Sequence, residues 1–237
     1  MSEQVTVVVP AYNEDVRIGA VLKPLIRARK KGIISDIIVV DDGSVDRTVK
    51  VVSEFPVKLI KLTRNYGKGA ALHAGINESK TDIVLFLDAD LVGLQNMHIE
   101  RLTKPIVDNP NLGMTTGIFR KSGFVANFGN MLQSLSGQRA VRKTWVQNVP
   151  GLENSKYGAD SLMNRYAKIH GIKTVKVYID HLSHVYKEQK HNFFIGFFHY
   201  RMKMYLEIFA VKFGFKLSNK KCEETYVSSD AHETLKN

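Results

Sequence analysis

Short apolar runs alternate with helical patterns through the first part of the chain. Four segments rich in β-branched residues have the pattern of strands buried on both faces: 5–9, 37–40, 57–62 and 83–87. The spacing of apolar and small residues between them predicts helices over 18–26, 46–52 and 67–77. Pro24 falls inside the first helix, where we expect it to interrupt the pattern. Repeated strand–helix units predict an α/β fold, with a parallel sheet covered by helices on both faces.

The second half of the chain is less regular. Its apolar spacing predicts strands over 112–119 and 174–179 and helices over 128–141, 161–170 and 193–213. Gly171 is the expected stop of the 161–170 helix. No internal repeat or linker interrupts the pattern. We therefore expect a single domain over 1–217, followed by a loose polar tail over 218–237.

The composition is that of a globular chain with a basic surface. Hydrophobic residues make up 44% of the 237 residues and charged residues 24%, which excludes a disordered chain. Cys222 is the single cysteine, so an internal disulfide is excluded and a reducing compartment is expected. The net charge of +11 suits anionic partners, namely nucleic acid, anionic lipid or phosphorylated substrates.

The amino terminus carries no sign of export. The sequence MSEQVTVVVP enters a predicted strand without the basic and apolar segments of a secretory signal. No run reaches the ~18 apolar residues of a membrane span. We expect a cytoplasmic protein and leave open peripheral attachment to the inner face of the cell membrane.

Polar clusters follow the four predicted strands of the first half. They are PAYNE at 10–14, DDGS at 41–44, RNYGKG at 64–69 and DAD at 88–90. In an open parallel sheet, ligands bind just beyond the carboxyl ends of the strands. The four clusters, called the polar rim below, offer carboxylates for a metal, a lysine for phosphate and acceptors for a base or ribose.

The Asp88-Ala89-Asp90 triplet is the sharpest of these clusters. Hard divalent cations prefer carboxylate oxygens, and Mg²⁺ or Mn²⁺ often bridges such groups to substrate phosphates. A turn with a helix cap is the alternative, although it needs only one of the two acids. Asp41 and Asp42 equally suit a turn or a binding site. Gly67-Lys68-Gly69 opens a predicted helix whose free amides could meet phosphate.

Taken in order and spacing, four segments resemble glycosyltransferase family 2 and its GT-A fold: VVVPAYNE, IIVVDDGSVDRT, RNYGKGAALHAGI and DIVLFLDAD. The resemblance is close over about 5–91 and looser to about 186. It implies a GT-A fold, a Rossmann-like and mostly parallel sheet with helices on both faces. It also implies a donor half over about 1–91, an acceptor half over about 92–190 and a basic aromatic helix over about 191–217.

The resemblance also implies a set of binding residues. The nucleotide-sugar would be bound by Pro10, Ala11, Tyr12, Glu14, Asp41, Asp42, Arg64, Lys68, Asp88, Ala89 and Asp90. In this set the 10–14 turn and Asp42 hold the nucleoside, and Asp41 supports their loop. Arg64 and Lys68 face the nucleotide end. Asp88 and Asp90 bind the diphosphate through the cofactor, Mn²⁺ or Mg²⁺.

Three further positions are implied on the acceptor side. Asp160 is the candidate general base, with a helix N-cap as the alternative, and Ala159 departs from the Glu-Asp pair often found there. Gln138 and Arg139 lie in a segment similar to one in polyprenyl-phosphate glycosyltransferases and glucosyl-3-phosphoglycerate synthases. They would contact acceptor or donor phosphate, unless Arg139 lies on a solvated helix face.

A histidine would complete the metal shell in the second of those families. His184 resembles it best, although a structural hydrogen-bonding role stays open. If His184 is a ligand, a retaining mechanism becomes possible. The sequence leaves open whether the reaction inverts or retains configuration.

The predicted 193–213 helix is basic and aromatic. One face carries Phe194, Phe198, Met202, Tyr205, Phe209 and Phe213, with Arg201 and Lys212 in the same arc. This pattern suits a helix lying among lipid headgroups and equally a core helix beneath the sheet. Nucleic acid is not expected as a partner, because no nucleic-acid module is present.

The function expected from these residues is metal-dependent transfer of a sugar from a nucleotide-sugar donor. A UDP-sugar is favoured over GDP-mannose, and the acceptor is expected to be lipid-linked, such as polyprenyl phosphate, or a cell-envelope glycan. A nucleotidyltransferase is one alternative, but its first loop should be rich in glycine and arginine, unlike 10–14. A non-catalytic nucleotide-sugar or lipid-binding module is the other. The oligomeric state stays open.

Overall fold

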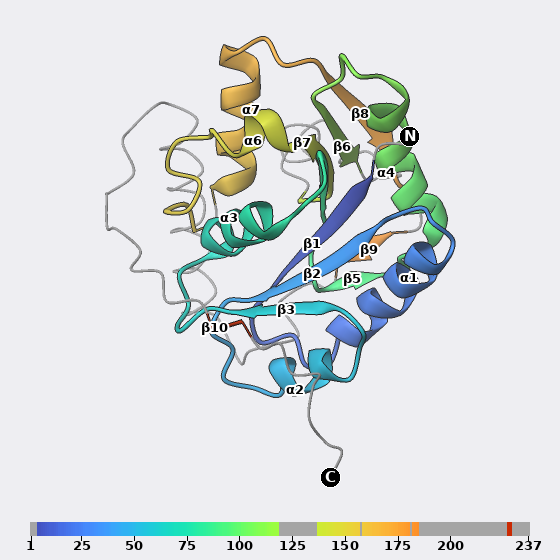
Figure 1. The fold of residues 1–237 in the computed structure, drawn as a ribbon. Helices are drawn as coiled ribbons and strands as arrows, with labels where there is room; N and C mark the ends of the chain where they lie inside the picture. The colour runs from blue at the N-terminus through green and yellow to red at the C-terminus, as the bar shows by residue number, and fades with distance from the viewer. Residues whose placement is uncertain (1–3, 119–136, 157, 181, 185–226, 229–237) are drawn as a thin grey trace, which may run out of the picture.

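The protein has an α/β fold in the computed structural model, which describes residues 4–118, 137–156, 158–180, 182–184 and 227–228 (Figure 1). The four strands expected in the first half are confirmed as β1 (Val5–Ala11), β2 (Asp36–Asp41), β3 (Lys58–Lys61) and β4 (Ile83–Phe86). The three helices between them are α1 (Ile18–Lys30), α2 (Thr48–Ser53) and α3 (Lys68–Glu78). Pro24 lies buried within α1 and, contrary to expectation, does not interrupt it.

The main sheet is mostly parallel where the Rossmann-like half lies. Its strand order is β10-β3-β2-β1-β4-β7-β6-β8, and β6 (Met114–Ile118) pairs in parallel with β8 (Thr174–Tyr178). The strand β7 (Arg139–Arg142) runs antiparallel between β4 and β6. A second, two-stranded sheet pairs β5 (Leu91–Val92) with β9 (Ser183–His184).

Helices cover both faces of the main sheet, as predicted. The alternation along β1 explains the layers, because Val7 and Val9 join one buried cluster while Val8 joins the other. The first cluster includes residues of α1, α2 and α4 (Asn96–Asp108), and the second includes residues of α3, α6 (Lys143–Val146) and α7 (Ala159–Ile169). The result is a three-layer arrangement that leaves the strand ends available for a site.

The helix predicted over 128–141 is wrong where the structure describes it. Residues 139–142 form β7, and Ala140 and Val141 are fully buried between β4 and β6. A short apolar segment shows neither a helical nor a strand period clearly. Pairing with β4 on one side and β6 on the other makes this segment a strand. The remainder of the predicted helix, 128–136, lies outside the described residues. The sequence pattern also left α4 unpredicted, although Ile99, Leu102 and Ile106 have helical spacing.

The carboxyl-terminal expectations fall mostly outside the described residues. That is true of the 193–213 helix and of most of the 218–237 tail, so the single-domain boundary at 217 stays a prediction. Within the tail, β10 (Val227–Ser228) pairs antiparallel with β3. Within the part of the chain that the structure describes, no helix is long and apolar enough to cross a membrane.

Close packing of α3 on β1 depends on Gly75. A Cβ at this position would lie 2.3 Å from Val8 Cγ1, whereas a Cβ on Gly19 in α1 would meet Phe55 at an ordinary 3.5 Å. We expect Gly75→Ala to lower the free energy of unfolding by about 1–3 kcal/mol through overpacking. Gly19→Ala, the matched control, should raise it by up to about 1 kcal/mol through helix propensity. Urea unfolding of both variants measures this, and equal effects would contradict it.

Candidate active site

The carboxyl ends of the parallel strands bring the polar rim together. β1 and β2 run in register from Thr6↔Asp36 to Ala11↔Asp41, and β1 and β4 pair in the same direction. The clusters that follow these three strands therefore lie at one edge of the sheet, as the sequence predicted. β5 continues directly from the acidic triplet, so the second sheet begins at the same edge.

The loops after β1 and β2 lock each other in place. Asp41 Oδ2 accepts a hydrogen bond from the Ser44 amide at 3.1 Å, and Ser44 Oγ accepts one from the Asn13 amide at 2.9 Å. Asn13 Oδ1 in turn accepts from the Val45 amide at 3.0 Å. Asp41 thus supports the loop that the sequence assigned to it, and the 10–14 turn is held rigid against 41–45.

Asp42 braces the entrance to α3. Its two carboxylate oxygens accept hydrogen bonds from the amides of Tyr66, at 2.8 Å, and Gly67, at 2.9 Å. Burial raises the pKa of Asp42 to about 6, an effect that the two amide donors oppose but do not cancel. Because these amides already engage both oxygens, the first role of this carboxylate is to shape the loop on which Lys68 stands.

The amides at the start of α3 are not available to a phosphate. The Lys68 amide donates to Lys156 O at 3.1 Å and the Gly69 amide to Ser155 O at 2.8 Å. Together with the Gly67 amide, which Asp42 engages, three successive donors are satisfied within the chain. The expectation that these free amides meet phosphate is therefore wrong, because a loop remote in sequence folds over the helix terminus.

The Lys68 side chain stands between two acids. Its Nζ lies 2.8 Å from Asp88 Oδ1 and 3.1 Å from Asp160 Oδ2. Burial by itself would lower the pKa of Lys68, but the carboxylates of Asp160 and Asp88 outweigh it and hold the pKa above its ordinary value. A permanently charged ammonium group thus links the acidic triplet to the start of α7.

Gln138 and Arg139 hold the other side of the same two acids. Gln138 Nε2 donates to Asp88 Oδ2 at 2.8 Å. Arg139 is fully buried, its Nη2 lies 3.2 Å from Asp160 Oδ1, and its Nη1 donates to Asn164 Oδ1 at 3.1 Å. The solvated-face interpretation of Arg139 is therefore wrong. Arg139 belongs to the central strand β7, and its guanidinium fixes the first turn of α7 through Asp160.

Asp160 is not the N-cap of α7. Gly158 occupies that position, and Asp160 lies in the first helical turn with 9% of its surface exposed. Both of its oxygens face cations, Lys68 on one side and Arg139 on the other. The sequence pattern predicted a role for Asp160 but not its two cationic partners. Lys68 lies 92 residues before it and Arg139 lies 21 residues before it.

The remaining predicted residues line the same edge with differing exposure. Tyr12 is 43% exposed, whereas Glu14 and Ala89 are buried and Asp90 and Pro10 are partly buried. Arg64 is exposed, and its guanidinium lies 4.9 Å from the centre of the Tyr66 ring. Tyr12 and Arg64 therefore form the open outer part of the site, and Glu14 and Ala89 lie beneath the surface.

Two further observations concern space at the acidic triplet. A Cβ on Gly137 would lie 2.5 Å from both Lys68 Nζ and Asp88 Oδ2, so a side chain there would disturb this pair. Pairing of β5 with β9 sets Leu91 opposite His184. The backbone of His184 therefore lies beside the residue that follows Asp90, and its side chain lies outside the description.

Comparison with known protein families identifies the family to which this chain belongs. The model of the family described as "Glycosyl transferase family 2" matches residues 6–173, which covers every described element from β1 to α7. The chain belongs to glycosyltransferase family 2. It is accordingly a glycosyltransferase, and the resemblance carried by its first four clusters is confirmed.

Named relatives match part of this family 2 glycosyltransferase. It is 42% identical over 94 residues to the undecaprenyl-phosphate 4-deoxy-4-formamido-L-arabinose transferase of Edwardsiella ictaluri, over 37% of this chain and 29% of that protein. It is 35% identical over 102 residues to the human dolichyl-phosphate beta-glucosyltransferase, over 38% of this chain and 32% of that protein. The matched segments thus span less than a third of either relative.

A solved structure shares the fold of this family 2 glycosyltransferase. It is the glucosyl-3-phosphoglycerate synthase of Mycobacterium tuberculosis, in complex with Mn²⁺, UDP and phosphoglyceric acid. The TM-score is 0.74 at 21% identity, over 90% of this chain and 78% of that one. The likeness confirms the predicted GT-A fold.

The pKa of Asp42 gives a test of the loop that carries Lys68. A carboxyl whose pKa is raised by folding stays protonated to a higher pH in the folded protein than in the unfolded chain. The free energy of unfolding therefore falls as the pH rises from about 4 to about 6. The wild type should therefore lose stability relative to Asp42→Asn across this window, by on the order of 2–3 kcal/mol. Urea unfolding at several pH values measures the difference, and a flat difference would contradict the assignment.

Proposed function

We propose that this family 2 glycosyltransferase transfers a sugar from a nucleotide-sugar donor to a phosphate-bearing acceptor, with Mn²⁺ or Mg²⁺ as cofactor. The observation that carries the proposal is the series of charges at the sheet edge, in which Lys68 links Asp88 to Asp160. Such a series offers carboxylates for a metal and a fixed cation for phosphate within one site. A UDP-sugar is favoured over GDP-mannose as the donor.

The donor would lie along the polar rim. The 10–14 turn and the 41–45 loop suit a base and ribose, because their mutual hydrogen bonds fix the backbone next to the exposed Tyr12. Arg64 lies on the open side, where a nucleotide would approach. Lys68 stands next to the acidic triplet, in a position to neutralise charge on a diphosphate. Asp42, with both oxygens engaged, would act on the nucleoside through the shape of its loop.

The residues after β4 fit a hard divalent cation. Asp90 supplies carboxylate oxygens, and Asp88 supplies the remaining lone pairs of two oxygens that already contact Lys68 and Gln138. The backbone of His184 lies beside the residue that follows Asp90. Among the described side chains, no three acidic, histidine or cysteine residues converge on one point, so diphosphate oxygens and water would complete the shell. When bound, the metal neutralises the charge that grows on the leaving diphosphate. The Mn²⁺ and UDP complex of the mycobacterial neighbour supports this assignment.

The contacts of Asp160 favour a phosphate acceptor. Both carboxylate oxygens face cations, so Asp160 could remove a proton from a hydroxyl only after Lys68 moved away. A phosphate oxygen needs no base, because a phosphate monoester is largely ionised at neutral pH. The lipid-phosphate acceptors in the names of two relatives agree with polyprenyl phosphate. A cell-envelope glycan would require Asp160 as general base.

A membrane location follows from the lipid acceptor. The net charge of +11 and the basic aromatic segment over 191–217 support attachment to an anionic surface at the cytoplasmic face. Liposome flotation with anionic lipid tests this, and protein that stays out of the lipid fraction would count against it.

Metal dependence is tested at Asp90. Asp90→Asn should lower turnover of a UDP-sugar by at least about 100-fold, because a carboxylate ligand of the metal is lost. Asp82→Asn is the matched control, since Asp82 is exposed and precedes the opposite end of β4. Release of nucleoside diphosphate across a Mn²⁺ titration provides the measurement. Equal turnover by both variants at every Mn²⁺ concentration would refute the metal site.

The role of Asp160 separates the two acceptor classes. With polyprenyl phosphate, Asp160→Asn should keep the wild-type dependence of kcat on pH, because the nucleophile is already ionised. With a hydroxyl acceptor, the same change should lower kcat by about 10²–10⁴-fold. Thermal unfolding must accompany both assays, since Arg139 loses a partner in this variant. A lost basic limb in the pH profile with polyprenyl phosphate would overturn the phosphate proposal.

A further inference from the structure

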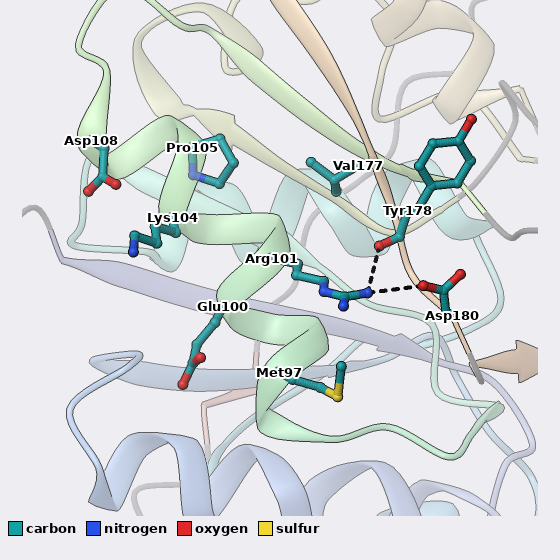
Figure 2. A pocket seen from close by; sticks show the side chains of 9 residues that line it. All are labelled: Met97, Glu100, Arg101, Lys104, Pro105, Asp108, Val177, Tyr178 and Asp180. Atoms are coloured by element: carbon teal, nitrogen blue, oxygen red, sulfur yellow. Dashed lines mark hydrogen bonds and ion pairs between the residues drawn. The ribbon is translucent and has the colours of Figure 1, made fainter.

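Helix α4 holds the segment that runs from the end of β8 toward β9. Two side chains of this helix, His98 and Arg101, both contact Asp180, just beyond the carboxyl end of β8. Figure 2 shows Arg101 reaching across to Tyr178 and Asp180. These three residues are among those that line an open groove of about 840 Å³ along α4. The groove is of mixed charge, and neither side chain touches the charges around Lys68 in the described contacts.

His98 is the buried part of this attachment. It is 1% exposed, and its Nδ1 accepts a hydrogen bond from the Gln95 amide at 3.1 Å. The ring proton therefore resides on Nε2, which donates to Asp180 O at 2.8 Å. One imidazole thus ties the first turn of α4 to a backbone carbonyl 82 residues away.

Arg101 is the exposed part. Its Nη1 lies 3.3 Å from Tyr178 O and 3.3 Å from Asp180 Oδ2. The side chain is 43% exposed, so water screens this ion pair and its contribution is small. The buried contact of His98 should therefore dominate, with Arg101 adding a smaller constraint in the same direction.

The segment held in this way leads directly to His184. His184 lies four positions after Asp180 in the sequence, a reach of at most about 14 Å. Leu182 is buried between them, and His184 then pairs with Leu91, next to Asp90. Apolar burial of Leu182 is not directional, whereas the hydrogen bond from His98 fixes the orientation of the Asp180 carbonyl, three residues before β9 begins.

We propose that His98 and Arg101 are positioning residues for the metal site, because they set where β9 presents His184 relative to Asp90. The inference rests on the proposed function, in which Asp90 belongs to the metal shell, and it adds His184 to that shell. Partners that orient a metal ligand typically change metal affinity when they are removed, although they do not touch the metal. Helix α4 thereby controls metal affinity from outside the site.

The test compares Mn²⁺ affinity with UDP affinity. His98→Leu should weaken Mn²⁺ binding in the presence of UDP by about tenfold. Arg101→Ala, an exposed change, should weaken it by up to about fivefold. UDP binding in EDTA should be unchanged in both variants. Electron paramagnetic resonance of free Mn²⁺ and calorimetry of UDP provide the two measurements.

Two variants control for general effects on the fold. Lys104→Ala lies on the same exposed side of α4 and lines the same groove, so it should bind Mn²⁺ like the wild type. His98→Gln carries an acceptor and a donor spaced like those of the imidazole, and it should stay within about twofold of the wild type. Should His98→Leu fail to fold in thermal unfolding, Arg101→Ala still decides the question. A loss of UDP binding in EDTA would point to a merely structural role and overturn the inference.

His184→Ala and Asp90→Asn separate the possible failures. If His184→Ala weakens Mn²⁺ binding while His98→Leu and Arg101→Ala leave it unchanged, the positioning role is overturned and the metal site stands. If His184→Ala has no effect while Asp90→Asn does, His184 is not a ligand and the inference falls with it. If neither matters, the metal-dependent function itself fails.

Discussion

A run of paired charges at the sheet edge is the constraint on which the candidate site depends. Asp88 and Asp160 both meet the Lys68 ammonium, and Asp160 also meets the fully buried guanidinium of Arg139. Removing an ion from water costs several kcal/mol, and only well-placed partners offset that cost. Each charge is therefore held by its neighbours, and the loss of one partner leaves another charge buried and uncompensated.

These charges join parts of the chain that are far apart in sequence. Lys68 begins α3 in the first half of the chain, whereas Arg139 and Asp160 come from β7 and α7 in the second half. The backbone strengthens the same connection, since the carbonyls of Ser155 and Lys156 accept the first amides of α3. Groups from the two halves of the chain are thus fixed relative to each other before any ligand binds, which would lower the cost of aligning the two substrates of the proposed reaction.

The rim was predictable because a simple rule governs it. Parallel strands present their carboxyl ends at one edge, so four polar clusters after four apolar runs had to meet there. The predictions were wrong where residues from distant parts of the chain determine the secondary structure or the hydrogen bonds of a segment. The segment at 139–142 became a strand because β4 and β6 flank it, and the amides of Lys68 and Gly69 were taken by a loop more than 80 residues later. The helix α4, and with it the attachment of Asp180 by His98, had no recognised chemical signal in the sequence.

The sequence by itself determined the family, the α/β class and the identity of the rim residues, because those follow from local periodicity and from side-chain chemistry at the ends of strands. Tertiary structure alone decided what each residue of the candidate site contacts. Asp42 became a brace for a loop, Arg139 a buried partner and Asp160 a carboxylate between two cations. The physical reason is that the charge state and availability of a polar group depend on neighbours brought close in space, and these come from any part of the chain.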